Sequence, residues 1–204
     1  MVHLRYFSSF TLLTKHFLIM RKLLLCAAFA LCGLLTMNAQ VSFGGKAGVN
    51  FASVNGDDVG SVDARTSFHV GGVVNISFND VFGLQPEIIY SSQGFEIDGL
   101  GGGTGKLDYI NIPVLVDITV VEGLSFQGGP QVGINITDEF DADGGGSGDL
   151  DAESIDLSAV AGAQYRLPMG VFFQARYALG ITDVISDVDI KNGVFSLSVG
   201  YFFN

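Results

Sequence analysis

Cysteine is nearly absent from this sequence, and its two copies, Cys26 and Cys32, both lie within the first 40 residues. The chain from Gln40 onward therefore contains no disulfide and no cysteine-ligated metal centre. Proline is also scarce, with four copies in 204 residues. Since proline removes a backbone donor from a ladder, its scarcity leaves long stretches free to form β-strands.

Positive charge is equally scarce after Gln40. That part of the chain holds all 21 acidic residues but six basic ones, which are Lys46, Arg65, Lys106, Arg166, Arg176 and Lys191. Its formal charge is therefore −15. A protein of that sign repels phosphates, so nucleic acid is excluded as a partner.

Long hydrophobic runs are missing from the same region. Although 48% of all residues are hydrophobic, no segment after Gln40 offers the roughly 18 uninterrupted apolar residues that a membrane-spanning helix needs. The apolar residues instead alternate with polar ones. This period of two predicts β-strands with two unlike faces.

The N-terminal segment has the features of a secretory signal peptide. Met20-Arg21-Lys22 precedes an apolar run from Leu23 to Leu35, and Met37-Asn38-Ala39 follows it. A transmembrane anchor is the alternative, but the run is shorter than the roughly 20 residues that such an anchor requires. We expect residues 1–39 to be an upstream extension plus a signal peptide cleaved before Gln40, and residues 40–204 to be one β-barrel domain.

The C-terminal stretch Gly193 to Asn204 is the clearest strand. Large apolar side chains occupy every second position, and small or polar ones lie between them, with Phe202 as the exception. An amphipathic final strand with an aromatic end is typical of transmembrane β-barrels, in which the last strand pairs with the first.

Seven further stretches alternate in the same way. Tight turns separate some of these stretches, and long polar loops at 55–66, 93–106, 137–155 and 182–192 separate the others. Long loops at one end and short turns at the other predict an all-β fold, an eight-stranded antiparallel up-and-down transmembrane β-barrel. An interior of that size is filled by side chains, so we expect no open pore.

The ionisable residues of the strands share one face, opposite the apolar one: Lys46, His69, Glu87, Asp117, Asp156, Arg166 and Arg176. A soluble barrel of the lipocalin type would show the reverse arrangement. An apolar face of eight strands exceeds what a monomer exposes to water, so lipid is its expected neighbour. The interior charges of both signs are then expected to pair in one polar network.

The sequence offers three candidates for a chemical site. Gly99 to Lys106 is glycine-rich but lacks the first glycine and the final Ser or Thr of a phosphate-binding loop. Glu139, Asp141 and Asp143 resemble half of a calcium loop, although Leu150 stands where the bidentate Glu belongs, which makes them weak metal candidates.

The remaining candidate is His69, the one histidine after Gln40. It could act as a general base for Ser67 or Ser91 with Glu87 as the orienting acid. A satisfied interior polar residue is the alternative, and we favour it. We therefore predict no catalytic residue and no cofactor.

Several motifs resemble the PorT-like outer membrane protein β-barrel domain family of Gram-negative Bacteroidota. They are Gly48 to Phe51, Gly83 to Ser91 (GLQPEIIYS), Tyr109 to Pro113 (YINIP), Gly128-Gly129-Pro130, Arg176-Tyr177 and the aromatic C-terminal strand. The resemblance implies an outer-membrane location and an eight-stranded barrel. One family member is associated with type IX secretion.

These observations lead to a functional hypothesis. We expect a non-enzymatic outer-membrane component that acts in the cell envelope, with a possible link to a type IX-like secretion assembly. Its expected partners are outer-membrane lipid, the barrel-assembly machinery through the C-terminal strand, and envelope proteins through the four loops. A small-solute transport or ligand-binding barrel is the alternative, and a membrane-embedded hydrolase using His69 is a third possibility.

Overall fold

The computed structural model describes residues 40–55, 63–97, 103–142, 147–149, 154–182 and 191–203. The expected signal segment, residues 1–39, lies outside them. The strands of the described residues are β1 (Gln40–Asn55), β2 (Asp63–Ser77), β3 (Phe82–Ile97), β4 (Gly103–Val121), β5 (Leu124–Ala142), β6 (Ser147–Asp149), β7 (Ile155–Arg166), β8 (Val171–Gly180) and β9 (Lys191–Phe203). No helix among the described residues is long and apolar enough to span a bilayer.

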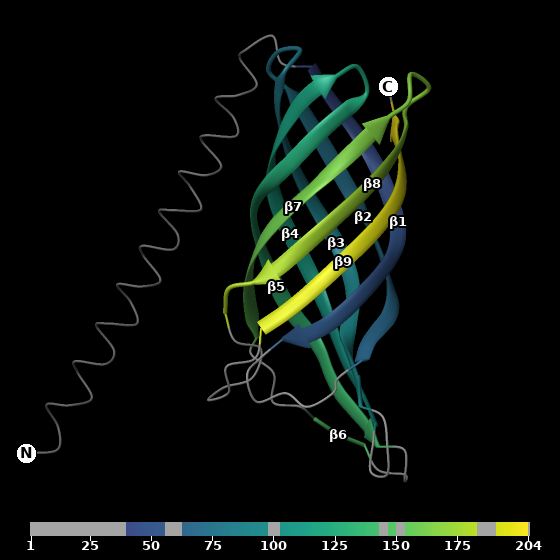
Figure 1. Ribbon diagram of the computed structural model, residues 1–204, viewed down its shortest axis with the longest axis vertical. Helices are drawn as coiled ribbons and strands as arrows, with labels where there is room; N and C mark the ends of the chain where they lie inside the picture. Colours follow the sequence, from purple (N-terminus) through teal and green to yellow (C-terminus); the bar gives the residue numbers. More distant parts are fainter. Residues whose placement is uncertain are drawn as a thin grey trace, which may run out of the picture. The chain divides into compact units, whose positions relative to one another are not determined.

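The strands close into a barrel. Strands β1 to β5 pair antiparallel in sequence order, β5 pairs with β7, and β7, β8 and β9 follow in the same way. Pairing of β9 with β1 closes the barrel. The short β6 pairs with β5 alone and is not one of the strands of the barrel wall. The eight-stranded antiparallel barrel expected from the sequence is therefore confirmed (Figure 1).

Side chains alternate between the interior and the outer surface. Along β4 the positions from Asn111 to Ile118 are alternately buried and exposed. The outer surface is apolar all round the barrel, and its exposed residues include Phe43, Val49, Phe68, Val70, Ile88, Ile112, Val114, Val116, Phe126, Val132, Leu157, Phe173, Leu179, Leu197 and Val199. Such a surface is stable against lipid acyl chains and not against water.

Aromatic residues mark the two edges of this surface. At the barrel seam Phe43 pairs with Phe203, and further along the same two strands Phe51 pairs with Phe195. The strand from Phe43 to Phe51 rises about 27 Å at roughly 3.4 Å per residue. A tilt of about 40° reduces this to about 20 Å along the barrel axis, close to the height of a lipid-facing band.

The structure corrects the boundaries of the expected loops. β2 begins within the expected loop 55–66, and β9 begins within the loop 182–192. β3 and β4 extend into the loop 93–106, and β5, with the added β6, extends into the loop 137–155. In β4 the alternation of burial continues through this part, but glycines at 103 and 105 occupy buried positions and polar residues at 104, 106 and 108 occupy the half-buried ones. Backbone pairing therefore continues without the apolar alternation that makes a strand visible in sequence.

Phe202, the exception in the C-terminal pattern, has its place at the turn end of the interior. Its ring is fully buried against Phe172, with ring centroids 4.7 Å apart, and Val73 completes the cluster. Gly200 makes room for the ring of Phe172, because a Cβ at position 200 would lie 2.3 Å from Cζ of that ring. The interior is therefore apolar at this end and polar further along.

A glycine also permits closure of the seam. A Cβ on Gly48 would lie 2.0 Å from the backbone oxygen of Leu197 in β9 and 2.7 Å from Cε1 of His69. Gly45, on the outer face of the same strand, would place its Cβ 3.8 Å from the nearest atom.

We therefore expect Gly48→Ala to lower the free energy of unfolding by about 1–3 kcal/mol through overpacking, whereas Gly45→Ala should change it by less than about 0.5 kcal/mol. Urea unfolding followed by circular dichroism measures both, since the protein has no tryptophan. Equal destabilisation by the two substitutions would contradict this account of the seam.

Candidate functional site

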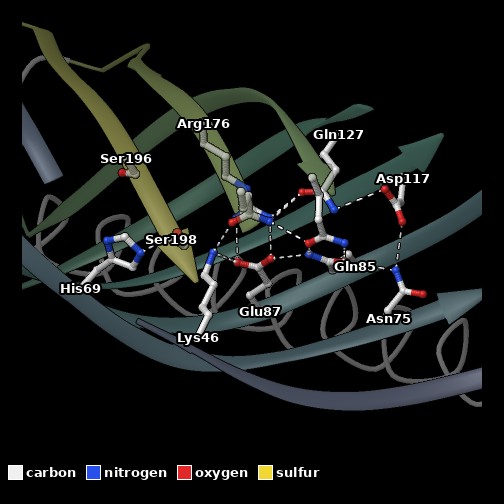
Figure 2. Close-up of polar contacts among 12 residues, drawn as sticks. Lys46, His69, Asn75, Gln85, Glu87, Asp117, Gln127, Arg176, Ser196 and Ser198 are labelled. Carbon is white, nitrogen blue, oxygen red and sulfur yellow. Dashed lines mark hydrogen bonds and ion pairs between the residues drawn. The ribbon is translucent and has the colours of Figure 1, made fainter. Parts of the chain in front are cut away.

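Three charged side chains meet inside the barrel. Nζ of Lys46 in β1 lies 2.7 Å from Oε2 of Glu87 in β3. The guanidinium of Arg176 in β8 donates from Nη1 to Oε2 at 2.7 Å and from Nη2 to Oε1 at 2.5 Å. The carboxylate is thus held by two cations, one of them in the bidentate geometry that arginine favours (Figure 2).

These contacts span the lumen. Three strands separate β3 from β8 along the sheet, so the pair between Arg176 and Glu87 crosses the barrel and does not run along one wall. The side chains of Lys46, Glu87 and Arg176 are 2%, 0% and 7% exposed. Charges buried this deeply persist only when paired, so the cluster ties the opposite walls together.

Amide side chains extend the cluster toward the turn end. Oε1 of Gln127 accepts from Arg176 at 2.8 Å, and its Nε2 donates to Asp117 at 3.3 Å. Asn75 also donates to Asp117, at 3.0 Å, and Gln85 donates to Glu87 at 2.8 Å. Gln127 therefore links the ion cluster to the fourth interior charge (Figure 2).

Three of the predicted network members, Asp156, Arg166 and His69, lie elsewhere. Asp156 accepts hydrogen bonds from Ser158 and Thr182 near the loop end of β7. Arg166 lies at the turn end, where its guanidinium carbon is 4.4 Å from the centroid of Phe202. The single network expected from the sequence is thus divided among three levels of the barrel, because side chains on one face of a strand are spread along its whole length.

His69 belongs to a separate cluster at the seam. Its Nδ1 is 2.8 Å from Oδ1 of Asn50, and its Nε2 is 2.8 Å from Oγ of Ser198. Since an amide oxygen only accepts, Nδ1 carries the proton and Nε2 accepts from the serine hydroxyl. Asn50 is held in this orientation because its Nδ2 donates to Ser91 and to the backbone oxygen of Ser92.

The serines expected beside His69 have other partners. Ser67 donates to the backbone oxygen of Ser92 at 2.6 Å, and Ser91 accepts from Asn50 and Gln93. The hypothesis of a pair with either serine is therefore wrong. Sequence reasoning missed Ser198 because it lies 129 positions from His69 and becomes adjacent only when β9 closes on β1.

The acidic candidates for a metal site lie on what we call the strand extension, made of residues 93–97 of β3, 103–108 of β4, 137–142 of β5 and the short β6. Asp141 accepts from Nζ of Lys106 at 2.6 Å, and this hydrogen bond raises the pKa of the lysine. Glu139 is paired in register with Lys106 on one side and with Asp149 on the other. Asp143 lies outside the described residues, within which no group of three potential metal ligands occurs.

Comparison with known proteins agrees with this geometry. The profile of the outer membrane protein beta-barrel domain family matches residues 37–186. Among curated proteins none matches the chain.

Solved structures share the fold at low sequence identity. Ail, the attachment invasion locus protein of Yersinia pestis, is 19% identical, with a TM-score of 0.53 over 80% of this chain and 99% of its own. A structure of Ail with the heparin analogue sucrose octasulfate has a TM-score of 0.54, at 19% identity and the same coverage. Neisserial surface protein A is also 19% identical, with a TM-score of 0.57 over 80% of this chain and 99% of its own.

The ion cluster yields a stability prediction. We expect Glu87→Gln to cost about 3–5 kcal/mol of unfolding free energy, because it leaves two buried cations without their carboxylate. The triple substitution Lys46→Met, Glu87→Gln and Arg176→Met removes all three charges and should recover most of that loss. Urea unfolding of the refolded barrel measures both, and a triple variant less stable than Glu87→Gln would contradict the pairing argument.

Proposed function

This chain belongs to the outer membrane protein beta-barrel domain family, and from that premise we propose that it is a non-enzymatic interaction component of the cell envelope. The barrel lies in the outer membrane with lipid around its apolar surface. In our proposal its interior is structural, and its contacts with partners are made by the strand extension at the loop end. That the chain belongs to the PorT-like group within this family is a more specific hypothesis, which rests on the sequence motifs.

The ion cluster is the observation that carries the proposal. Arg176 and Glu87 bridge the lumen, and amides fill the space beside them. The motif residues Gln85, Glu87 and Asn111 point inward, so the sequence motifs that characterise this barrel describe its interior. The residues that select its partners must then lie outside the lipid-facing band.

The strand extension is the described surface best suited to a partner. β3, β4, β5 and β6 pair there beyond the aromatic edge of the apolar surface. Its side chains include Asp108, Glu139 and Asp141, with Lys106 as a cation among them. An acidic surface favours a basic partner, and the charge of this chain makes a sulfated polyanion like that in the Ail complex a poor candidate.

A photo-reactive amino acid at position 139 tests the contact surface. We expect cross-links to an envelope protein in intact cells from position 139, on the extension, and none from position 122, in the short turn at the opposite end. Cross-links from position 122 alone would contradict the proposal. They would favour a periplasmic secretion assembly, since short turns face the periplasm.

The proposal also covers cleavage of the N-terminal segment and insertion of the barrel into the membrane. Cleavage of a signal peptide before Gln40 is proposed from the positive residues and apolar run that precede it in the sequence. The outward-facing row Phe195, Leu197, Val199, Tyr201 and Phe203 on β9 supports recognition of the last strand by the barrel-assembly machinery.

Hydrolysis is a second candidate because Ser198, His69 and Asn50 have the hydrogen-bond order of a catalytic triad. We favour a structural role, since these residues link β1, β2 and β9 across the seam.

Accordingly, a fluorophosphonate probe should not label the purified protein, whereas Ser198→Ala should lower its stability by about 1–3 kcal/mol because the imidazole loses a buried partner. Labelling that disappears in Ser198→Ala would establish the hydrolase instead.

A further inference from the structure

A small cavity adjoins the ion cluster on the side of the loops. Its volume is about 40 Å³, and its wall includes Lys46 and Arg176. Of the described residues that line it, none carries a carboxylate. The cavity thus has two cations and no anion of its own.

Unused hydrogen-bond donors face the same space. The side chain of Arg176 is more than nine-tenths buried, and its Nε has no hydrogen-bond partner. Lys46 bonds Glu87 and Gln174, which accounts for two of its three protons. Asn111 and Gln131, both buried in the cavity wall, make no side-chain hydrogen bond with any described residue. Among these groups, Nε of Arg176 is the donor that is buried without a partner. Such a donor is costly, so a ligand that accepts hydrogen bonds is favoured here.

The balance of charge points the same way. Lys46 and Arg176 share the single carboxylate of Glu87, which leaves one positive charge in excess at the cluster. Asp117 is reached only through Gln127 and accepts its hydrogen bonds from amides. An uncompensated charge away from water is unfavourable, and an anion in the cavity would offset it.

We propose that this cavity binds a small monovalent anion, such as a halide, nitrate or formate. A water-sized group needs about 10–15 Å³, so the space holds about three such groups. That admits a halide with ordered water or a planar oxyanion and excludes larger anions. The aliphatic side chains of Ile89, Val160 and Val194 in the wall favour an anion that is weakly hydrated. The site does not depend on the surface role proposed above.

Chloride relaxation tests the site in the refolded, micelle-bound barrel. We expect excess ³⁵Cl line broadening with the wild-type protein that competes with formate and falls at least fivefold in Asn111→Leu/Gln131→Leu. That pair of substitutions removes two donors and leaves the ion cluster intact. The matched control is Gln164→Leu, the same change at a buried amide outside the cavity wall, and it should keep the broadening.

Absence of excess broadening with the wild type, or equal broadening in the double variant, would overturn the proposal. If the double variant fails to fold, a wild-type crystal grown in bromide decides the question. An anomalous peak within hydrogen-bond distance of Nε of Arg176 supports the site, and water alone in the cavity overturns it.

Discussion

The carboxylate of Glu87, held between Lys46 and Arg176, is the interaction on which the rest of the barrel depends. Within the lipid-facing band an eight-stranded barrel has no aqueous exterior for charged side chains, so those of this band must lie inside, where burial makes pairing obligatory. The contacts of 2.5–2.7 Å join β1, β3 and β8 across the lumen. This contact spans the lumen and fixes opposite walls of the barrel.

The interior is organised in levels along the barrel axis. Aromatic packing of Phe172 and Phe202 fills the turn end, and the ion cluster with its amides follows. Beyond it lies the seam cluster of His69, Asn50 and Ser198. The seam joins the first and last strands, where no chain connection maintains the register. Side-chain hydrogen bonds across it, with Gly48 allowing close approach, replace that connection.

The fold could be predicted from the sequence because alternation assigns each strand residue to one of two faces. Lys46, Glu87 and Arg176 were recognised as interior residues in this way. Which residues meet depends on strand register and barrel closure, so the partner Ser198 and the separate positions of Asp156 and Arg166 were missed. The strand extension was missed for another reason: in β4 its buried positions include Gly103 and Gly105, and polar residues lie between them, so the sequence shows no apolar alternation there.

The central claim is a closed barrel whose apolar surface faces lipid. Gel mobility of unheated and heated protein from an outer-membrane fraction tests it most directly, since closed barrels resist detergent until they are boiled. We expect a heat-dependent shift in mobility. Identical mobility before and after heating, with the protein recovered soluble from the periplasm, would contradict it and would mean that the two faces of the strands are exchanged.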